Sequence, residues 1–328
     1  MPRSGRPSIA TLTLNPALDI ACAVDRLQPG QKLRCRDVRR DPGGGGINVA
    51  RVIRRLGGKA TAVFPAGGAT GDRLKMLLDY EGLPQRAIRI VGETREDFTA
   101  EEACTGAEYR FVFPGPNLRQ AELSALLAAV EALGPDILVA SGSLPPGVRK
   151  GALGTLARRA RVWGARLAVD AAGPALRHAL AAGVWLAKPN LAELEELTGT
   201  ALPDLPSRLE ACGAIVDRGG VEHLALSMGR EGALLVSKEG AWFAPALPII
   251  PVSAIGAGDS FLAGLVFALA GQRPPVQALA YAVAAGSAAL LAPGTQLARA
   301  SDVKAFAAKV SVERLRDTSA TRSQPAAA

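Results

Sequence analysis

The segment SAIGAGDS at residues 253–260 runs directly into the apolar segment FLAGLVFA at residues 261–268. This pattern predicts a glycine turn that opens a buried helix, because Gly256 and Gly258 tolerate close approaches that other residues resist. The first amides of such a helix point out of its N-terminus and can hold an anion. Asp259 lies among them, either as an ordinary first-turn carboxylate, which the helix dipole stabilises by about 0.3 to 1 kcal/mol, or as a reactive group. The sequence therefore predicts an anion site at this turn.

The composition is that of a globular α/β protein. The chain has 328 residues, of which 48% are hydrophobic and 21% charged, enough to bury a large core in one unit with or without an appendage. The net charge is +8, but the arginines are scattered and only 4% of the residues are aromatic. A basic balance of this kind suits phosphorylated small molecules, and we expect no nucleic-acid partner.

Cysteine and histidine usage argues against structural zinc and against a disulfide framework. Cys22, Cys35, Cys104 and Cys212 show no CxxC spacing, and His178 and His223 are the two histidines. Residues 1–8 lack the apolar core of a signal peptide, and the longest apolar run, residues 261–270, is too short to cross a bilayer. We therefore expect a cytoplasmic protein with no membrane partner.

The N-terminal segment predicts a ligand site at a strand end. Residues 9–14, IATLTL, form an expected buried strand that Asn15-Pro16 ends. Asp19 follows at the carboxyl end, the edge where parallel sheets bind ligands. It either accepts hydrogen bonds from a polyol or only ends a turn. Residues 32–40, KLRCRDVRR, predict a half-exposed strand.

A glycine-rich loop comes next, PGGGGINVARVIRRLG at residues 42–57. Bare backbone at Gly44 and Gly45 suits a polyhydroxylated ligand, and Asn48 lies on the first turn of the helix that follows. The alternative is a flexible tether, although tethers are rarely followed at once by an amphipathic helix. Neither GxGxxG nor GxxxxGK[ST] occurs, which argues against a dinucleotide-binding oxidoreductase and against a P-loop enzyme.

Residues 86–113 alternate polar with apolar side chains and predict a small β meander. Together with residues 20–40, this meander could form a sheet that covers the ligand site. Arg95 and Arg110 lie in it and are either solvated strand charges or ligands of an anion.

After residue 116 a βα rhythm resumes, and it contains a loop SGSLPPG at residues 141–147. A strand at residues 185–187 ends in Lys188-Pro189-Asn190, and a helix over 190–198 places Asn190 and Glu193 on its first turn. These two residues either ligate Mg²⁺, usually through water, or form a capping box. Residues 224–236 predict a hairpin beside a nucleotide, residues 276–291 and 301–309 predict helices, and residues 318–328 a frayed tail.

In combination, GGGGINVA at 43–50 and GAGD at 256–259 resemble the two signature regions of the PfkB (ribokinase-like) carbohydrate kinases. The resemblance extends from about residue 9 to residue 309, and TLTLNPALD, YRFVFPG and SGSLPPGV are most similar to the bacterial minor 6-phosphofructokinases of that family. It implies a three-layer α/β/α sandwich with a mostly parallel sheet and a small β lid that often forms a dimer interface. The implied catalytic domain comprises residues 9–19, 41–84 and 115–311, the lid residues 20–40 and 85–114, and the flexible termini residues 1–8 and 312–328.

The resemblance also implies a role for each matching residue. The activity would be ATP-dependent phosphorylation of the C1 hydroxyl of fructose 6-phosphate, a step of glycolysis, with Asp259 as the base and the turn Gly256, Ala257 and Gly258 as the anion hole. The sugar hydroxyls would be held by Asp19, Gly44, Gly45 and Asn48, and the sugar phosphate by Lys32, Arg95, Arg110 and Ser143. The ATP phosphates and Mg²⁺ would face Lys188, Asn190 and Glu193, and the nucleotide would lie along Ser227 and Gly229 to Gly232.

The sequence departs from the family pattern at two places, which bear on the expected binding of ATP and of K⁺. Ala254 stands where the family usually has a threonine, and Ala292 and Gln296 replace the asparagine and arginine that some relatives place near a potassium ion. Activation by K⁺ is therefore left open. Fructose 1-phosphate and tagatose 6-phosphate are the alternative acceptors. A non-catalytic sugar-phosphate sensor is the alternative from another class, but a sensor needs no base at Asp259.

Overall fold

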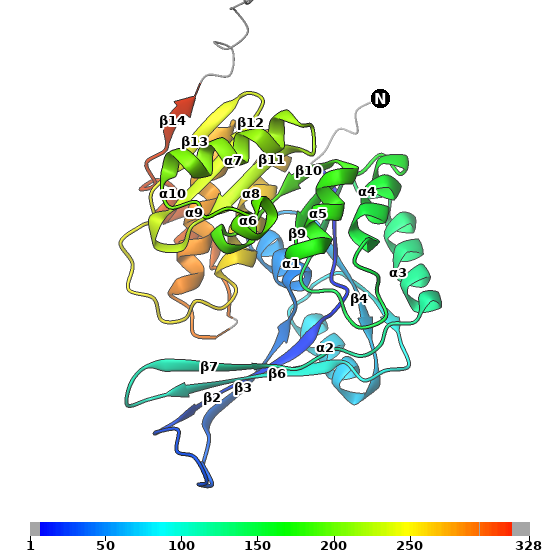
Figure 1. Cartoon of the computed structure of the whole chain (residues 1–328). Coiled ribbons are helices and arrows are strands. Elements are labelled where there is room, and N and C mark those ends of the chain that lie inside the picture. The colour runs from blue at the N-terminus through cyan, green and yellow to red at the C-terminus, as the bar shows by residue number, and fades with distance from the viewer. Residues whose placement is uncertain (1–6, 295, 317–328) are drawn as a thin grey trace, which may run out of the picture.

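In a computed structural model, which describes residues 7–294 and 296–316, the chain forms a ten-stranded sheet and a separate four-stranded sheet (Figure 1). The large sheet has the order β14-β13-β12-β11-β10-β9-β8-β1-β4-β5. It is parallel from β5 to β11 and antiparallel from β11 to β14. Its strands are β1 (Ile9–Leu12), β4 (Ala60–Ala66), β5 (Gln85–Arg89), β8 (Ile137–Ser141), β9 (Arg166–Asp170), β10 (Val184–Ala187), β11 (Val221–Ser227), β12 (Ala233–Ser237), β13 (Gly240–Ala244) and β14 (Glu313–Arg316).

Helices cover both faces of this sheet. Alternate residues of a strand point to opposite faces, so in β8 Ile137 and Val139 join one core, whereas Leu138 and Ala140 join the other. The first core also packs α1 (Gly45–Arg55), α2 (Gly68–Tyr80), α8 (Ala257–Ala270), α9 (Pro275–Leu290) and α10 (Ala300–Ala307). The second packs α3 (Gln120–Leu133), α4 (Ala152–Val162), α5 (Gly173–Ala182), α6 (Leu191–Thr198) and α7 (Leu205–Asp217). The predicted three-layer sandwich with a mostly parallel sheet is confirmed.

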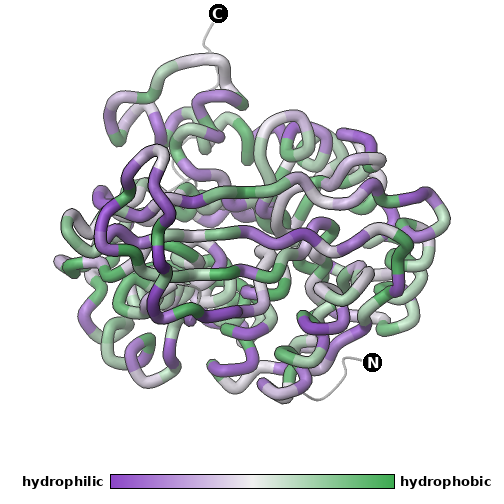
Figure 2. Tube along the Cα trace, turned by 90° about the horizontal axis from the view of Figure 1, so that it is seen from below, coloured by the Kyte–Doolittle hydropathy of each residue, from purple (hydrophilic) through white to green (hydrophobic). Residues whose placement is uncertain are grey.

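The small sheet has the order β3-β2-β6-β7, formed by β2 (Ala17–Val24), β3 (Arg36–Gly43), β6 (Arg95–Glu102) and β7 (Ala107–Val112). The view from below in Figure 2 shows it lying across one face of the larger domain. It is not a simple meander, because two antiparallel pairs are joined by parallel pairing of β2 with β6. We call this sheet the lid.

Four expected boundaries were wrong. β2 begins at Ala17 and β3 ends at Gly43, so the first lid segment extends beyond residues 20–40 at both ends. β5 pairs with β4 at the edge of the large sheet, so residues 85–89 do not belong to the lid. An edge strand is half-exposed, and its alternation therefore resembles that of a lid strand. At the other end, β14 pairs with β13, so residues 313–316 are not part of a flexible tail. Residues 1–6 and 317–328, which were expected to be flexible, lie outside the described residues.

The hairpin expected over 224–236 is present as the antiparallel pair β11 and β12, joined through the short 3₁₀ helix η1 (Gly229–Glu231). All four cysteines are free thiols. None of the helices in the described ranges has the length and apolar character needed to cross a membrane.

Candidate active site

A pocket of about 310 Å³ lies between the lid and the carboxyl edge of the parallel sheet. Ligands of open α/β sheets bind at this edge. The pocket collects most of the predicted sugar-site and catalytic residues and one predicted Mg²⁺ residue, Glu193; the others are Asp19, Gly44, Gly45, Asn48, Arg95, Arg110, Ser143, Gly256 and Asp259. Residues from five separate parts of the sequence therefore share one site.

The glycine turn before α8 has the predicted form. Gly256 is the N-cap residue with φ 73°, a left-handed conformation that glycine adopts readily. Gly258 and Asp259 follow in the first helical turn, where the backbone amides have no acceptor inside the helix. These amides can therefore donate to an anion in the pocket.

Asp259 is partly buried at the start of α8. Its Oδ2 accepts a hydrogen bond of 2.9 Å from Asn48 Nδ2. Burial and then the nearby Asp170 carboxylate raise the pKa of Asp259, whereas the Asn48 hydrogen bond and the charges of Lys188 and Arg110 oppose that rise. A carboxylate with a raised pKa is a stronger proton acceptor than an ordinary one, so the group suits general-base chemistry.

Lys188 and Asp170 form a buried ion pair beside this turn, with Lys188 Nζ 3.1 Å from Asp170 Oδ1. Burial, the largest single effect, acts to lower the pKa of Lys188, but the carboxylates of Asp170, Glu193 and Asp259 together raise it. A Cβ added at Gly258 would lie 3.7 Å from Lys188 Nζ, so the ammonium group is next to the proposed anion hole. Sequence reasoning missed Asp170, although its place at the end of β9, on the ligand-binding edge, was a usable signal.

Asp19 follows β1 in the chain, as expected, but it lies within β2 of the lid and not in the catalytic domain to which residues 9–19 were assigned. Burial raises its pKa to about 7; Arg110 and Arg95 oppose the rise, and Asp97 and Asp41 add to it. Arg95 is held by Asp97 Oδ1 at 3.2 Å and by the carbonyls of Phe113 and Asn15. Arg110 lines the pocket from the exposed strand β7. The lid thus brings two guanidinium groups, Arg95 and Arg110, and two carboxylates, Asp19 and Asp97, over the pocket.

The glycine loop forms the opposite wall because its backbone packs closely. A Cβ at Gly43 would collide with the Asp19 carboxylate, and one at Gly45 would collide with the Ser141 hydroxyl. Only glycine fits these positions without displacing a neighbour. The pocket wall therefore presents bare backbone, as the sequence predicted.

The residues predicted to bind the nucleotide lie at the carboxyl ends of the neighbouring parallel strands β10 and β11. Asn190 follows β10, and an isolated parallel bridge joins it to Ser227 at the end of β11. Gly229 begins η1 and Gly232 follows it, both at positive φ, 57° and 110°. Lys188, Asn190, Ser227, Gly229 and Gly232 do not line the pocket itself. Lys32 is exposed in the loop between β2 and β3, also outside the pocket.

The predicted Mg²⁺ residues form a capping box. Asn190 Oδ1 accepts from the Glu193 amide, and Glu193 Oε2 accepts from the Asn190 amide, both at 2.9 Å. Glu193 also lines the pocket. No cluster of three acidic, histidine or cysteine side chains that could hold a metal occurs in the described ranges. A single carboxylate fits Mg²⁺ bound through waters and substrate phosphates, and does not fit an all-protein cage.

Comparisons with known proteins agree with this geometry. The profile of the pfkB family carbohydrate kinases matches residues 12–301. An ATP-dependent 6-phosphofructokinase isozyme 2 of Mycobacterium tuberculosis is 42% identical over 92% of this chain and 89% of its own. A 1-phosphofructokinase of Xanthomonas campestris is 36% identical over 79% and 83%. The phosphofructokinase-2 of Escherichia coli, solved with substrates and products, is 40% identical over 92% and 99%, with a TM-score of 0.89; it has also been solved in a tetrameric inhibited form.

The ribokinase-like sandwich and the glycine-lined carboxylate under a β lid define a sugar kinase, an enzyme that transfers a phosphoryl group to an alcohol. More particularly, the chain belongs to the pfkB family of carbohydrate kinases, and its similarity supports a phosphofructokinase. Kinases of this family generally use ATP and Mg²⁺.

Proposed function

We propose that this enzyme transfers the γ-phosphoryl group of ATP to the C1 hydroxyl of fructose 6-phosphate, giving fructose 1,6-bisphosphate and ADP. The observation that carries the proposal is the position of Asp259 at the N-terminus of α8, in one pocket with Asp19, Arg95 and Arg110. A base, a carboxylate that accepts hydrogen bonds from sugar hydroxyls, and two anion-binding groups therefore meet in a single site.

In this proposal, Asp259 accepts the proton of the C1 hydroxyl as its oxygen attacks the γ-phosphorus. The amides of Ala257, Gly258 and Asp259 hold the transferring group, and the charge of Lys188 lies beside them. Such groups stabilise the charge that spreads over the phosphoryl oxygens in the transition state. Catalysis would then consist mainly of positioning and charge stabilisation.

The sugar is held from both sides of the pocket. Gly44, Gly45 and Asn48 contact its hydroxyls from the glycine loop, and Asp19 contacts them from the lid. Arg95, Arg110 and Ser143 bind its phosphate, and we keep Lys32 as a fourth predicted phosphate ligand. Arginine suits this task because its planar guanidinium pairs with two phosphate oxygens.

ATP lies along Ser227 and Gly229 to Gly232, with its phosphates near Lys188 and Asn190. In this proposal, Glu193 binds Mg²⁺ through coordinated water. When bound, the ion neutralises charge on the phosphates. Whether K⁺ activates the enzyme stays open, because Ala292 and Gln296 replace the asparagine and arginine that some relatives place near that ion.

The test is an ADP-release assay with ATP and Mg²⁺ that compares fructose 6-phosphate, fructose 1-phosphate, tagatose 6-phosphate and unphosphorylated fructose. The highest kcat/KM for fructose 6-phosphate is the expected result. A preference for fructose 1-phosphate would favour the second candidate, which the 36% identical relative named 1-phosphofructokinase supports. A preference for tagatose 6-phosphate would also replace the proposed acceptor, and no turnover with any of the four would overturn the proposal.

The raised pKa of Asp19 predicts a pH-dependent affinity for the sugar. Sugar hydroxyls donate to an ionised carboxylate, and with a pKa of about 7 this form becomes dominant only as the pH rises through 7. Between pH 6 and pH 8 the KM for fructose 6-phosphate should fall by about tenfold through this group. Steady-state kinetics across that range measure the effect. Asp19→Asn should remove this component and leave only the titration of the sugar phosphate; an identical pH dependence in the variant would contradict the assignment.

We also propose that two copies of the chain pair through their lids. The lid exposes apolar side chains that a second copy would cover: Tyr109 and Phe111, which share one face of β7, and the following Phe113 are 42% to 51% exposed. Exposed apolar surface of this kind commonly marks an interface. Phe111→Lys should convert a dimer into a monomer in light scattering after size exclusion, whereas Val162→Lys, at an 85% exposed position of α4, should leave the mass unchanged. A monomeric wild type, or a dimer that survives Phe111→Lys, would count against the lid interface.

A further inference from the structure

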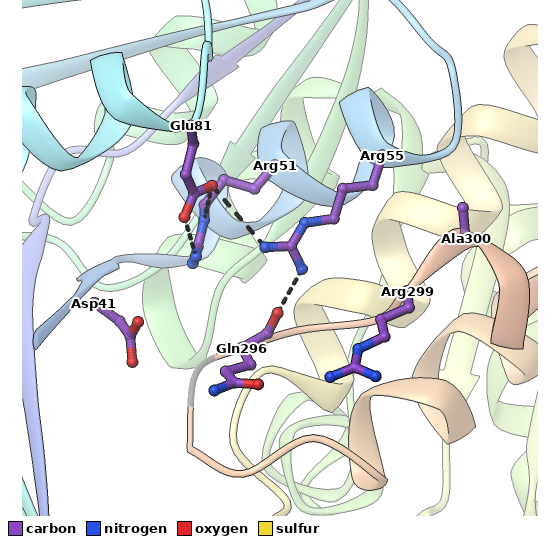
Figure 3. Close-up of a pocket in the computed structure, with 7 residues that line it drawn as sticks. All are labelled: Asp41, Arg51, Arg55, Glu81, Gln296, Arg299 and Ala300. Carbon is purple, nitrogen blue, oxygen red and sulfur yellow. Dashed lines mark hydrogen bonds and ion pairs between the residues drawn. The ribbon is translucent and has the colours of Figure 1, made fainter. Parts of the chain in front are cut away.

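Arg51 is a buried arginine on α1, with only 3% of its surface exposed. Glu81, which follows α2, holds its guanidinium through two hydrogen bonds, Nε to Oε2 at 2.9 Å and Nη2 to Oε1 at 2.6 Å (Figure 3). This bidentate geometry fixes the plane of the guanidinium as well as its position.

The same guanidinium reaches the glycine loop on its other side. Nη1 donates to the carbonyl of Pro42 at 3.1 Å and to Asn48 Oδ1 at 3.3 Å. Pro42 lies in the last part of the lid strand β3, and Asn48 is one helical turn before Arg51. Arg51 therefore contacts the end of the lid and a residue of the pocket at the same time.

Asn48 continues this chain of contacts to Asp259. A side-chain amide is planar, so a hydrogen bond to Oδ1 restricts the direction in which Nδ2 points. Nδ2 of Asn48 donates to Asp259 Oδ2 at 2.9 Å. Glu81, Arg51, Asn48 and Asp259 thus form a continuous series from the surface to the carboxylate at the anion hole.

Stability alone does not explain an arginine at this position. Its buried neighbours on α1 are apolar, Ile47, Val49, Val52 and Ile53. Burying an ion pair costs desolvation free energy, and an apolar side chain of similar volume often serves stability as well or better. Arg51 donates hydrogen bonds to the lid, to Asn48 and to Glu81. Its presence is better explained by the orientation that it imposes on Asn48.

The outer end of the series borders a second pocket, of about 520 Å³, which Figure 3 shows. Arg55 also approaches Glu81, at 4.0 Å, and donates to the Gln296 carbonyl. Arg55 is a weaker partner of Glu81 than Arg51, since its contact with that carboxylate is longer and more exposed.

We propose that Arg51 is a positioning residue that aligns the base Asp259 through Asn48 and ties this alignment to the end of the lid strand, with Glu81 as its anchor. This inference rests on the proposed role of Asp259 in phosphoryl transfer. Because lid and base share one guanidinium, a shift of the lid strand at Pro42 would also move the group that orients Asp259.

The test compares Arg51→Met, Arg51→Lys and Glu81→Gln with Arg54→Met, a control at an exposed position of the same helix. We expect Arg51→Met to lower kcat by about 10- to 100-fold, which is the loss of rate expected when a reacting group is misplaced. The KM for ATP should stay within about twofold, because Arg51 contacts no predicted nucleotide residue. Arg51→Lys keeps a charge but loses the bidentate fork, so its kcat should fall between those of Arg51→Met and the wild type.

The pH profile separates alignment from general damage. The hydrogen bond from Asn48 lowers the pKa of Asp259, so its loosening should move the acidic limb of kcat/KM to higher pH, by about 0.5 to 1 unit. The other charged groups that face Asp259 are Asp170, Lys188 and Arg110, and none of the four substitutions changes them. Arg54→Met should leave both kcat and the limb unchanged.

Circular dichroism and thermal unfolding establish that each variant is folded. If Arg51→Met does not fold, Glu81→Gln tests the positioning role in its place. This variant should fold, because the Glu81 side chain is 28% exposed and the amide keeps its size. An active wild type together with folded variants that keep kcat within threefold and an unshifted limb would overturn the positioning role. An inactive wild type would instead reject the proposed function itself.

Discussion

Replacing Asp259 by asparagine should lower kcat by about a thousandfold, within the range that a general base contributes. The amide keeps the size of the side chain and its place beside Asn48 but cannot accept the proton of the sugar hydroxyl. Binding of fructose 6-phosphate should persist, because the lid arginines and the glycine loop are unchanged. The melting temperature should stay the same or rise, since the raised pKa of Asp259 means that its ionised form is costly in the folded protein.

Asp302 provides a matched control for this experiment. It is also an aspartate in the first turn of a helix, α10, but it does not line the pocket. Asp302→Asn should cost no more than the helix-dipole contribution of about 0.3 to 1 kcal/mol and leave kcat unchanged. Single-turnover rates of both variants at saturating ATP measure the difference. If Asp259→Asn kept more than a tenth of the wild-type rate, Asp259 would be an ordinary first-turn residue like Asp302.

The parts of the site that were predictable from the sequence are those in which neighbouring residues determine their own geometry. A glycine turn before an apolar helix specifies both the exposed amides and the place of Asp259, and the pocket contains this turn as predicted. The glycine loop likewise specifies bare backbone next to Asn48. These are local consequences of glycine conformation and of helix termini.

The parts that were not predictable depend on contacts between distant segments. Arg51 and Glu81 are ordinary charged residues in the sequence, and only the approach of α1 to the end of α2 makes them an ion pair with a buried guanidinium. The place of β5 was mistaken for the same reason, because strand alternation reports exposure but not which sheet a strand joins. The place of Asp170 at the ligand-binding edge was predictable from the end of β9, but its ion pair with Lys188 depends on the side-by-side position of β9 and β10.

Replacing Lys188 by methionine should destabilise the protein by about 3 to 5 kcal/mol near pH 7.5, as expected when one partner of a buried ion pair is removed. Lys188 is 5% exposed, and its loss would leave the Asp170 carboxylate, 16% exposed, without a cation. Urea unfolding monitored by tryptophan fluorescence measures the change. Lys150→Met, at an exposed position, should alter stability by no more than about 0.5 kcal/mol.

The pH range of the ion pair and a second substitution identify the cause of that loss. In the wild type the raised pKa of Lys188 means that the stabilisation by the pair is complete at neutral pH and is lost only as the pH rises above the unfolded value of 10.5. In Lys188→Met the cost comes from the unpaired Asp170 carboxylate. Adding Asp170→Asn should restore most of the stability at pH 7.5. A double variant as unstable as Lys188→Met would show that lost packing, and not an uncompensated charge, is responsible.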